Sequence, residues 1–191
     1  MIVPDETVKE IFAEIESPNA PDAMYIREIR SGSGIRTKAR NFERSFYNAT
    51  CIDAMRLFRK TILQKTGGYD ESICGVEDWD LDRLILAESS AVKLTKGHLI
   101  HNEKKLSLKK TLEKKAYYAA SFEIYKAKWN NDAVIRKQFG AAYRFFGVFT
   151  ENGKWKKIIR NPVLFVIVMF ERFCVGCVYL REKAKSGDGK R

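Results

Sequence analysis

The chain has 191 residues, of which 45% are hydrophobic and 31% are charged, a composition that excludes a disordered chain and fits one domain, or one domain with an extension. Residues 1–103 carry 14 Lys and Arg against 17 Asp and Glu, whereas residues 104–191 carry 21 against 7. Residues 1–103 therefore have the charge balance of an ordinary acidic domain. The basic residues of 104–191 favour either a phosphate-bearing partner, such as nucleic acid or anionic lipid, or a solvated helix surface.

The start of the chain and its cysteines suggest a reducing compartment. The first six residues lack the basic and apolar parts of a secretory signal, so we expect the four cysteines to be free thiols. Cys174 and Cys177 have CxxC spacing, but they lie in an apolar run without a second cysteine pair or a nearby histidine. Zinc is therefore not predicted there.

Hydrophobic spacing and turn residues predict the elements in chain order. They are a helix over 7–15, a strand over 23–29, a helix over 35–47, a strand over 49–58, a short helix over 59–65, a helix over 77–88, a strand over 91–100, a long helix over 107–129 and another helix from residue 133. The residues from 183 to 191 are predicted to be disordered.

The most apolar segment is 162–180, and its length is near the 20 residues that a membrane-spanning helix needs. Glu171 and Arg172 lie at its centre and make spanning costly. Basic residues flank it on both sides: Lys154, Lys156, Lys157 and Arg160 before, and Arg181, Lys183 and Lys185 after. Three interpretations stay open, namely a helix in the membrane interface, a helix packed on protein, and a true span.

An acidic cluster opens the predicted helix over 77–88. Glu77, Asp78, Asp80 and Asp82 fall within six positions and repel one another, so one of them could hold a raised pKa and act as a general base. On a helix Asp78 and Asp82 share a face, and Asp80 is spaced to pair with Arg83. The alternative is helix capping by surface acids.

Two further groups of residues could bind ligands. His101 ends an apolar strand and precedes Asn102 and Glu103, an arrangement common among metal ligands, although a histidine hydrogen-bonded at a domain edge fits equally. The helix over 35–47 carries Arg36, Lys38, Arg40 and Arg44, which could meet a diphosphate or form a solvated face. The aromatic residues have core spacing, and neither an RNA-binding sheet signature nor a helix-turn-helix pattern is visible, so nucleic acid is not expected as a partner.

Three pieces of the chain together resemble the family 2 glycosyltransferases. They are Gly67-Gly68-Tyr69-Asp70-Glu71, then Glu77-Asp78-Trp79-Asp80-Leu81 with Arg83, and finally His101-Asn102-Glu103. In that family a G-G-F/Y-D-E turn is followed by an E-D-x-D-L/F-x-x-R helix and then by a strand that ends in histidine. The resemblance covers residues 1–129, which we treat as one region, followed by a basic and apolar helical region over 130–185 and a tail over 186–191.

The resemblance implies an α/β fold of the GT-A type, with a mostly parallel sheet. It also implies an inverting transfer of a sugar from a nucleotide-diphospho-sugar donor to the hydroxyl group of a glycan or a lipid-linked acceptor. Asp78 would be the base that deprotonates this hydroxyl group, and Glu77 would position the acceptor or the base.

The resemblance implies further site residues. Gly67 and Gly68 would let the turn pass close under the acceptor, and Trp79 and Asp80 would belong to the acceptor site. His101 would lie near the donor diphosphate and could ligate Mg²⁺ or Mn²⁺, since a divalent cation stabilises the departing nucleoside diphosphate.

One departure from the family is large. The family's nucleotide-binding βαβ region and its D-x-D metal motif come before a phrase like Met1-Ile2-Val3-Pro4, which here opens the chain. We therefore expect an acceptor-side half that is inactive alone and rests peripherally on the cytoplasmic face of a membrane. It would be either a truncated product or a subunit that a separate N-terminal half completes. The alternative is a non-catalytic interaction protein at a membrane surface.

Overall fold

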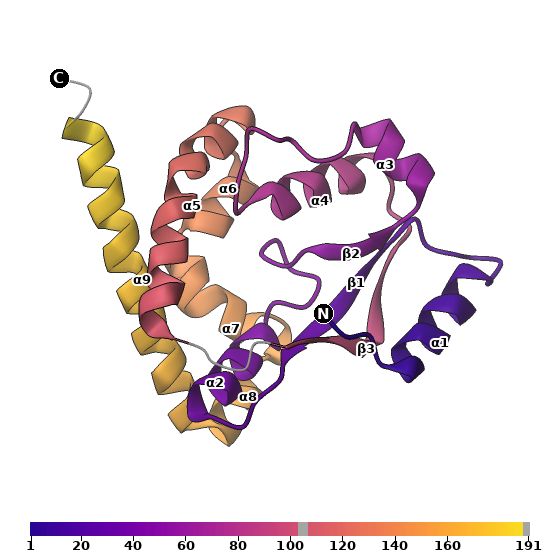
Figure 1. The fold of residues 1–191 in the computed structure, drawn as a ribbon, viewed down its shortest axis with the longest axis horizontal. Helices are drawn as coiled ribbons and strands as arrows, with labels where there is room; N and C mark the ends of the chain where they lie inside the picture. The colour runs from indigo at the N-terminus through magenta and orange to yellow at the C-terminus, as the bar shows by residue number, and fades with distance from the viewer. Residues whose placement is uncertain (103–106, 189–191) are drawn as a thin grey trace.

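A computed structural model describes residues 1–102 and 107–188 of the chain and has an α/β architecture, as predicted (Figure 1). Its sheet has the strand order β2-β1-β3. The central strand β1 (Ala23–Arg30) pairs antiparallel with β2 (Met55–Phe58) and parallel with β3 (Val92–His101). The sheet is therefore mixed, and the finer expectation of a GT-A sheet stays a prediction.

Helix α1 (Asp5–Ile15) packs against β3 through a polar contact. The Thr7 hydroxyl accepts a hydrogen bond from the His98 amide at 3.0 Å and donates one to the His98 carbonyl at 3.1 Å. A side chain at Gly97 would collide with Thr7, because a Cβ there would lie 2.4 Å from Oγ1. Close approach of the helix to the strand therefore requires a glycine at this position.

Helices α3 (Lys60–Thr66) and α4 (Glu77–Glu88) lie against each other next to the sheet. Leu81 and Ile85, one turn apart on α4, point into a hydrophobic cluster with residues of β1, β2 and α3. The other members of this cluster are Ala23, Tyr25, Met55 and Ile62. Burial of this apolar face sets the rotation of α4 and thereby decides where its acidic residues lie.

The rest of the chain is helical. After α5 (Leu108–Lys128) come α6 (Ala133–Phe139), the π-helical turn η1 (Tyr143–Gly147), α7 (Val148–Thr150), the 3₁₀ turn η2 (Glu151–Gly153), α8 (Trp155–Arg160) and α9 (Pro162–Asp188). Helix α9 packs along both α5 and α2 (Ile35–Arg44), at the edge of the molecule opposite α1 (Figure 1).

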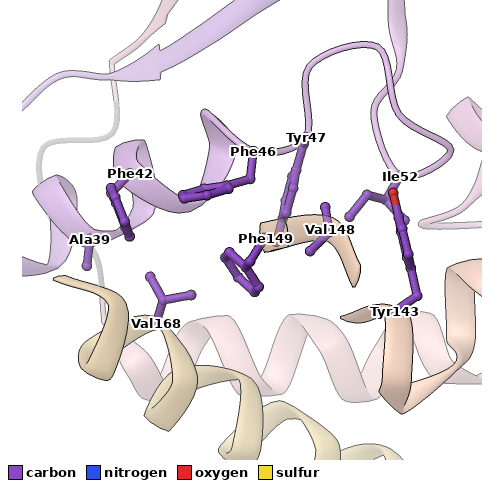
Figure 2. Close-up of a cluster of buried hydrophobic side chains, with 9 residues drawn as sticks. All are labelled: Ala39, Phe42, Phe46, Tyr47, Ile52, Tyr143, Val148, Phe149 and Val168. Carbon is purple, nitrogen blue, oxygen red and sulfur yellow. The ribbon is translucent and has the colours of Figure 1, made fainter. Parts of the chain in front are cut away.

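Residues 1–129 (the front region) and residues 130–185 share one hydrophobic cluster, shown in Figure 2. Phe46 is fully buried and makes edge-to-face contacts with Phe42 and Phe149, whose ring centroids lie 5.0 Å and 4.9 Å away. Val168 of α9 points into the same cluster. Residues 130–185 are therefore packed onto the front region by apolar contact rather than held beside it as a separate extension.

Three predicted elements differ from the structure by three residues or more. The helix expected over 35–47 ends at Arg44. The strand expected over 49–58 is limited to Met55–Phe58, because the preceding residues form turns in which Asp53 accepts a hydrogen bond from the Ala49 amide at 2.7 Å. The disorder expected from residue 183 is wrong up to Asp188, since α9 continues that far. Residues 189–191 of the expected tail lie outside the described residues.

Candidate functional site

The aspartates of α4 differ in how deeply they are buried. Asp80 is 0% exposed and Asp82 is 6% exposed, whereas the side chain of Asp78 is 35% exposed. Since α4 turns its apolar face toward the sheet and its other side toward α5, the acids at positions 80 and 82 point into the protein. The expectation that all of them are surface acids is therefore wrong for Asp80 and Asp82.

Asp80 ties three segments together. Its carboxylate accepts hydrogen bonds from the indole of Trp129 at 2.7 Å and from the ammonium group of Lys128 at 2.8 Å. Lys128 also donates to Asp70 at 2.7 Å, and this bond is the largest cause of a pKa of about 2 at Asp70. The turn with its paired glycines, the start of α4 and the end of α5 are thus held in one arrangement.

Asp82 connects α4 to the sheet. The hydroxyl of Tyr25 and the backbone amide of Met55 both donate hydrogen bonds to its carboxylate at 2.7 Å. Burial raises the pKa of Asp82 to about 7, despite the opposing effect of these two bonds. Its role in the structure is to anchor β1 and β2 to α4.

Arg83 does not pair with Asp80. It forms an ion pair with Asp132, and its guanidinium lies 3.8 Å from the centre of the Trp129 ring. Asp132 is also the N-cap of α6, where it accepts a hydrogen bond from the Ile135 amide at 2.9 Å. The motif arginine therefore positions the end of α5 and the start of α6.

Asp78 is the α4 aspartate that reaches solvent. Its Oδ2 atom accepts a hydrogen bond from Nη1 of Arg56 at 3.0 Å. The pKa of Tyr69 is raised, mainly by burial and secondly by the negative charge of Asp78. The tyrosine of the glycine turn is therefore close enough to feel this carboxylate. Next to it, Glu77 is half-buried, and its Oε2 atom is buried without a hydrogen-bond partner among the described residues.

A buried carboxylate links Asp78 to His101. Glu28 of β1 contacts Nε of Arg56 at 2.6 Å, forms an ion pair with Arg44, and lies 3.3 Å from Nε2 of His101. The chain of contacts runs from Asp78 through Arg56 and Glu28 to His101. Two guanidinium groups and two carboxylates thus form one network beside His101.

The described ranges contain no group of three or more His, Cys, Asp or Glu side chains that could hold a metal ion by themselves. Mg²⁺ usually binds through one or two carboxylates together with substrate phosphates. Glu28, the carboxylate beside His101, already contacts Arg44 and Arg56. Glu103, the other acid of this motif, lies outside the described residues, and a divalent cation stays a prediction.

Glycines shape the loop before α4. Gly67 and Gly68 both have left-handed backbone angles, with φ of 79° and 77°, and Gly67 ends α3. Gly75 has φ of 84°, and a Cβ there would lie 2.2 Å from Cγ of Tyr118. A larger side chain at Gly75 would therefore collide with Tyr118.

Trp79 lies between two hydrophobic clusters. It is half-buried, and its ring contacts Phe139 edge-to-face at a centroid distance of 5.9 Å. The structure therefore places it at the junction of α4 and α6.

Three of the four basic residues of α2 form ion pairs within the protein and are not a solvated face. Arg36, Arg40 and Arg44 are half-buried and form ion pairs with Glu171, Glu43 and Glu28 respectively, and Lys38 is exposed. These pairs join α2 to α9 and to β1.

Sequence reasoning missed Glu28, Arg56 and Lys128, which connect the pieces of the motif. The available signal was a charged residue inside an apolar strand pattern, which occurs at Glu28 and Arg56. Buried charges are costly unless they are paired, so such residues indicate a network.

Comparisons of this chain with protein-family models, with curated proteins and with solved structures find no match.

Proposed function

We propose that this chain carries the acceptor side of an inverting glycosyltransferase that uses a nucleotide-diphospho-sugar donor. The observation that carries the proposal is the separation of the α4 acids. Asp80 and Asp82 are buried in contacts between elements, whereas Asp78 is partly exposed and connects through Arg56 and Glu28 to His101.

The geometry of Asp78 suits a general base. A base needs a fixed carboxylate that a substrate hydroxyl group can reach, and Arg56 fixes Oδ2 while the side chain stays partly exposed. In the proposed step, Asp78 takes the proton of the acceptor hydroxyl group as its oxygen bonds to the anomeric carbon. The bond from that carbon to the diphosphate breaks, and the nucleoside diphosphate leaves with the electron pair.

The surroundings support a site for a charged donor next to this base. Arg44 and Arg56 share the single carboxylate of Glu28, and His101 lies at the same group. These cationic side chains would donate hydrogen bonds to a diphosphate and stabilise the negative charge that develops on it as the bond breaks. Trp79 and Asp80 would act by holding the shape of the acceptor site, since both contact other helices.

The test is a transfer assay on membranes from source cells that lack the gene, to which the purified full chain is added. Radiolabelled nucleotide-sugars serve as donors, and the label that reaches the membrane fraction is measured. Asp78→Asn should lower the rate by about 10²- to 10⁴-fold, because a general base contributes that much.

A matched control removes one charge from the other end of the same helix. Glu88 is exposed and pairs with Lys65, so Glu88→Gln should keep the rate within about twofold of the original. Equal rates for Asp78→Asn and Glu88→Gln would contradict the assignment of the base.

A second measurement addresses the donor and the cation. The purified chain is titrated calorimetrically with UDP, GDP and their common sugars, with and without Mn²⁺. Micromolar binding would assign part of the donor site to this chain, and dependence on Mn²⁺ would support the predicted cation. Absence of binding from a folded chain would assign the donor site to a separate half.

A further inference from the structure

Helix α9 presents an uncharged apolar stripe to the outside of the molecule. Its members recur at alternating steps of three and four residues, which places them on one side of a helix: Val163, Val166, Phe170, Phe173, Cys177 and Leu180. The five members other than the cysteine are between 59% and 67% exposed. With a rise of 1.5 Å per residue the stripe is about 25 Å long, and such a patch marks an interaction surface.

The two central charges of α9 point away from this stripe. Glu171 and Arg172 are 7% and 8% exposed. Glu171 accepts a hydrogen bond from Nε of Arg36 at 2.8 Å, and Nε of Arg172 donates one to Glu43 at 2.8 Å. The charges that argued against contact with lipid are thus neutralised against α2, and the outer face of α9 is free of them.

Both ends of the stripe are basic. Lys154 and Lys157, which precede α9, donate hydrogen bonds to the backbone carbonyls of Phe46 and Ser45, each at 2.8 Å. These two ammonium groups therefore stabilise contacts within the protein. The basic residues that remain exposed on either side of the stripe are Lys156, Arg160, Arg181 and Lys183. Exposed Trp155 and Ile159 accompany the first of these groups.

We propose that this surface of α8 and α9 binds an anionic lipid bilayer, with α9 lying in the plane of the interface. The apolar stripe enters the boundary between head groups and acyl chains, and the basic ends contact anionic head groups. This inference concerns attachment, and it is independent of the reaction proposed above.

The charge pattern favours a bilayer over a second copy of the chain. Two copies paired along the stripe would bring basic ends together in a parallel arrangement and also in an antiparallel one, because both ends carry positive charge. Like charges held together are unfavourable, whereas an anionic surface complements both ends at once.

The packing of α9 favours the interface over a span. Val168 is buried in the cluster with Phe149 and Ala39, and Glu171 and Arg172 are paired on that same side. A spanning helix would have to leave α2 and expose these two charges to lipid, which is costly. A helix in the interface keeps its inner face on the protein.

The test is flotation of the full chain with vesicles of phosphatidylcholine that contain either no anionic lipid or about 30% phosphatidylglycerol. We expect flotation with the anionic vesicles and a decrease at high salt. The double substitution Val166→Glu with Phe170→Glu should lower the bound fraction at least about tenfold, because two charges would enter the interface.

A matched control places the same two charges on exposed apolar residues of other helices. Phe12 of α1 and Leu86 of α4 are 58% and 48% exposed, so Phe12→Glu with Leu86→Glu should leave flotation unchanged. Circular dichroism checks that both double variants are folded. Extraction of the bound chain by alkaline carbonate is expected of an interfacial helix.

Three results would overturn the proposal. The first is no flotation with either vesicle type. The second is equal flotation of the α9 variant and the unsubstituted chain, and the third is resistance to carbonate, which indicates a span. A dimer in light scattering that the α9 variant dissociates, without flotation, would assign the stripe to a second copy instead.

Discussion

Asp78, Asp80 and Asp82 are identical side chains on one helix, and their surroundings give them different chemistry. Asp80 meets a tryptophan and a lysine, Asp82 meets a tyrosine and a backbone amide, and Asp78 meets an arginine at the surface. Burial raises the pKa of Asp82 to about 7. Proximity to a motif therefore does not distinguish a catalytic acid from an anchoring one, whereas burial and partners do.

The raised pKa of Asp82 leads to a prediction for stability against pH. Between its ordinary value of about 3.8 and about 7, the folded state keeps a proton at Asp82 that the unfolded state releases. This contribution to stability is complete below the lower value and is lost as the pH rises through the higher one. Asp82→Asn should therefore flatten the pH dependence of the free energy of unfolding in this window, by up to about 1.4 kcal/mol per pH unit.

Urea unfolding at several pH values across the window measures this slope. Asp53, whose pKa burial also raises, is present in both proteins, so the difference between them reports Asp82 and its coupling to Asp53. Glu88→Gln, at an exposed position of the same helix, serves as the control. An unchanged slope in Asp82→Asn would show that Asp82 is ionised in the folded protein at these pH values.

Among the secondary structure elements, α4 is held by polar contacts on one side and apolar contacts on the other. Leu81 and Ile85 pack toward the sheet, and Asp80 accepts from Lys128 and Trp129 of the α5 end. The glycine turn joins the same contact through Asp70 and Lys128. The orientation of Asp78, the candidate base, thus depends on the contacts that Asp80 makes with the end of α5.

Asp80→Ala tests this contact between elements. The indole of Trp129 would lose its acceptor, and Lys128 would keep only Asp70, so we expect a loss of about 2–3 kcal/mol in the free energy of unfolding. Asp78→Ala on the same helix should cost less than about 1 kcal/mol, since that ion pair is partly exposed. Urea unfolding of the two variants provides the comparison, and equal losses would refute the distinction between an anchoring and a surface acid.

For the molecule as a whole, the attachment of α9 to the front region is the main long-range feature. Arg172 reaches Glu43 and Tyr47 of the α2 segment, and its guanidinium lies 4.5 Å from the centre of the Phe149 ring. Burial opposes ionisation of Glu43, but Arg40 and Arg172 outweigh it and lower the pKa of Glu43 to about 2. The pairing of one buried carboxylate with these arginines holds the rear helices on the sheet region.

Arg172→Met tests this attachment. Loss of one partner of a buried pair should cost about 3 kcal/mol. The pKa of Glu43 should also rise, because one of the cations that offset burial is gone, so acid unfolding should begin at a higher pH. Urea unfolding and amide hydrogen exchange along α9 measure both effects. Arg160→Met, at an exposed position, should change stability by less than about 0.5 kcal/mol, and a similar small change in Arg172→Met would refute the role of the pair.

Most of the local structure follows from the sequence alone. The helix over 77–88 has the predicted bounds, the strand over 23–30 is one residue longer than predicted, and the strand over 92–101 is shifted by one residue. The paired glycines at 67 and 68 have the left-handed angles that make a tight turn. Periodicity, caps and turn residues act over a few positions, so these features can be derived without knowledge of the fold.

Which charged groups meet depends on the tertiary structure. Asp80 finds Lys128 and Trp129, 48 and 49 residues away, and Arg172 finds Glu43 across 129 residues. Spacing along a helix tells which side chains share a face, but not what that face contacts. Burial and ion pairing depend on the packing of distant elements, and for that reason the separation of Asp78 from its buried neighbours, and of the outer from the inner face of α9, required the folded chain.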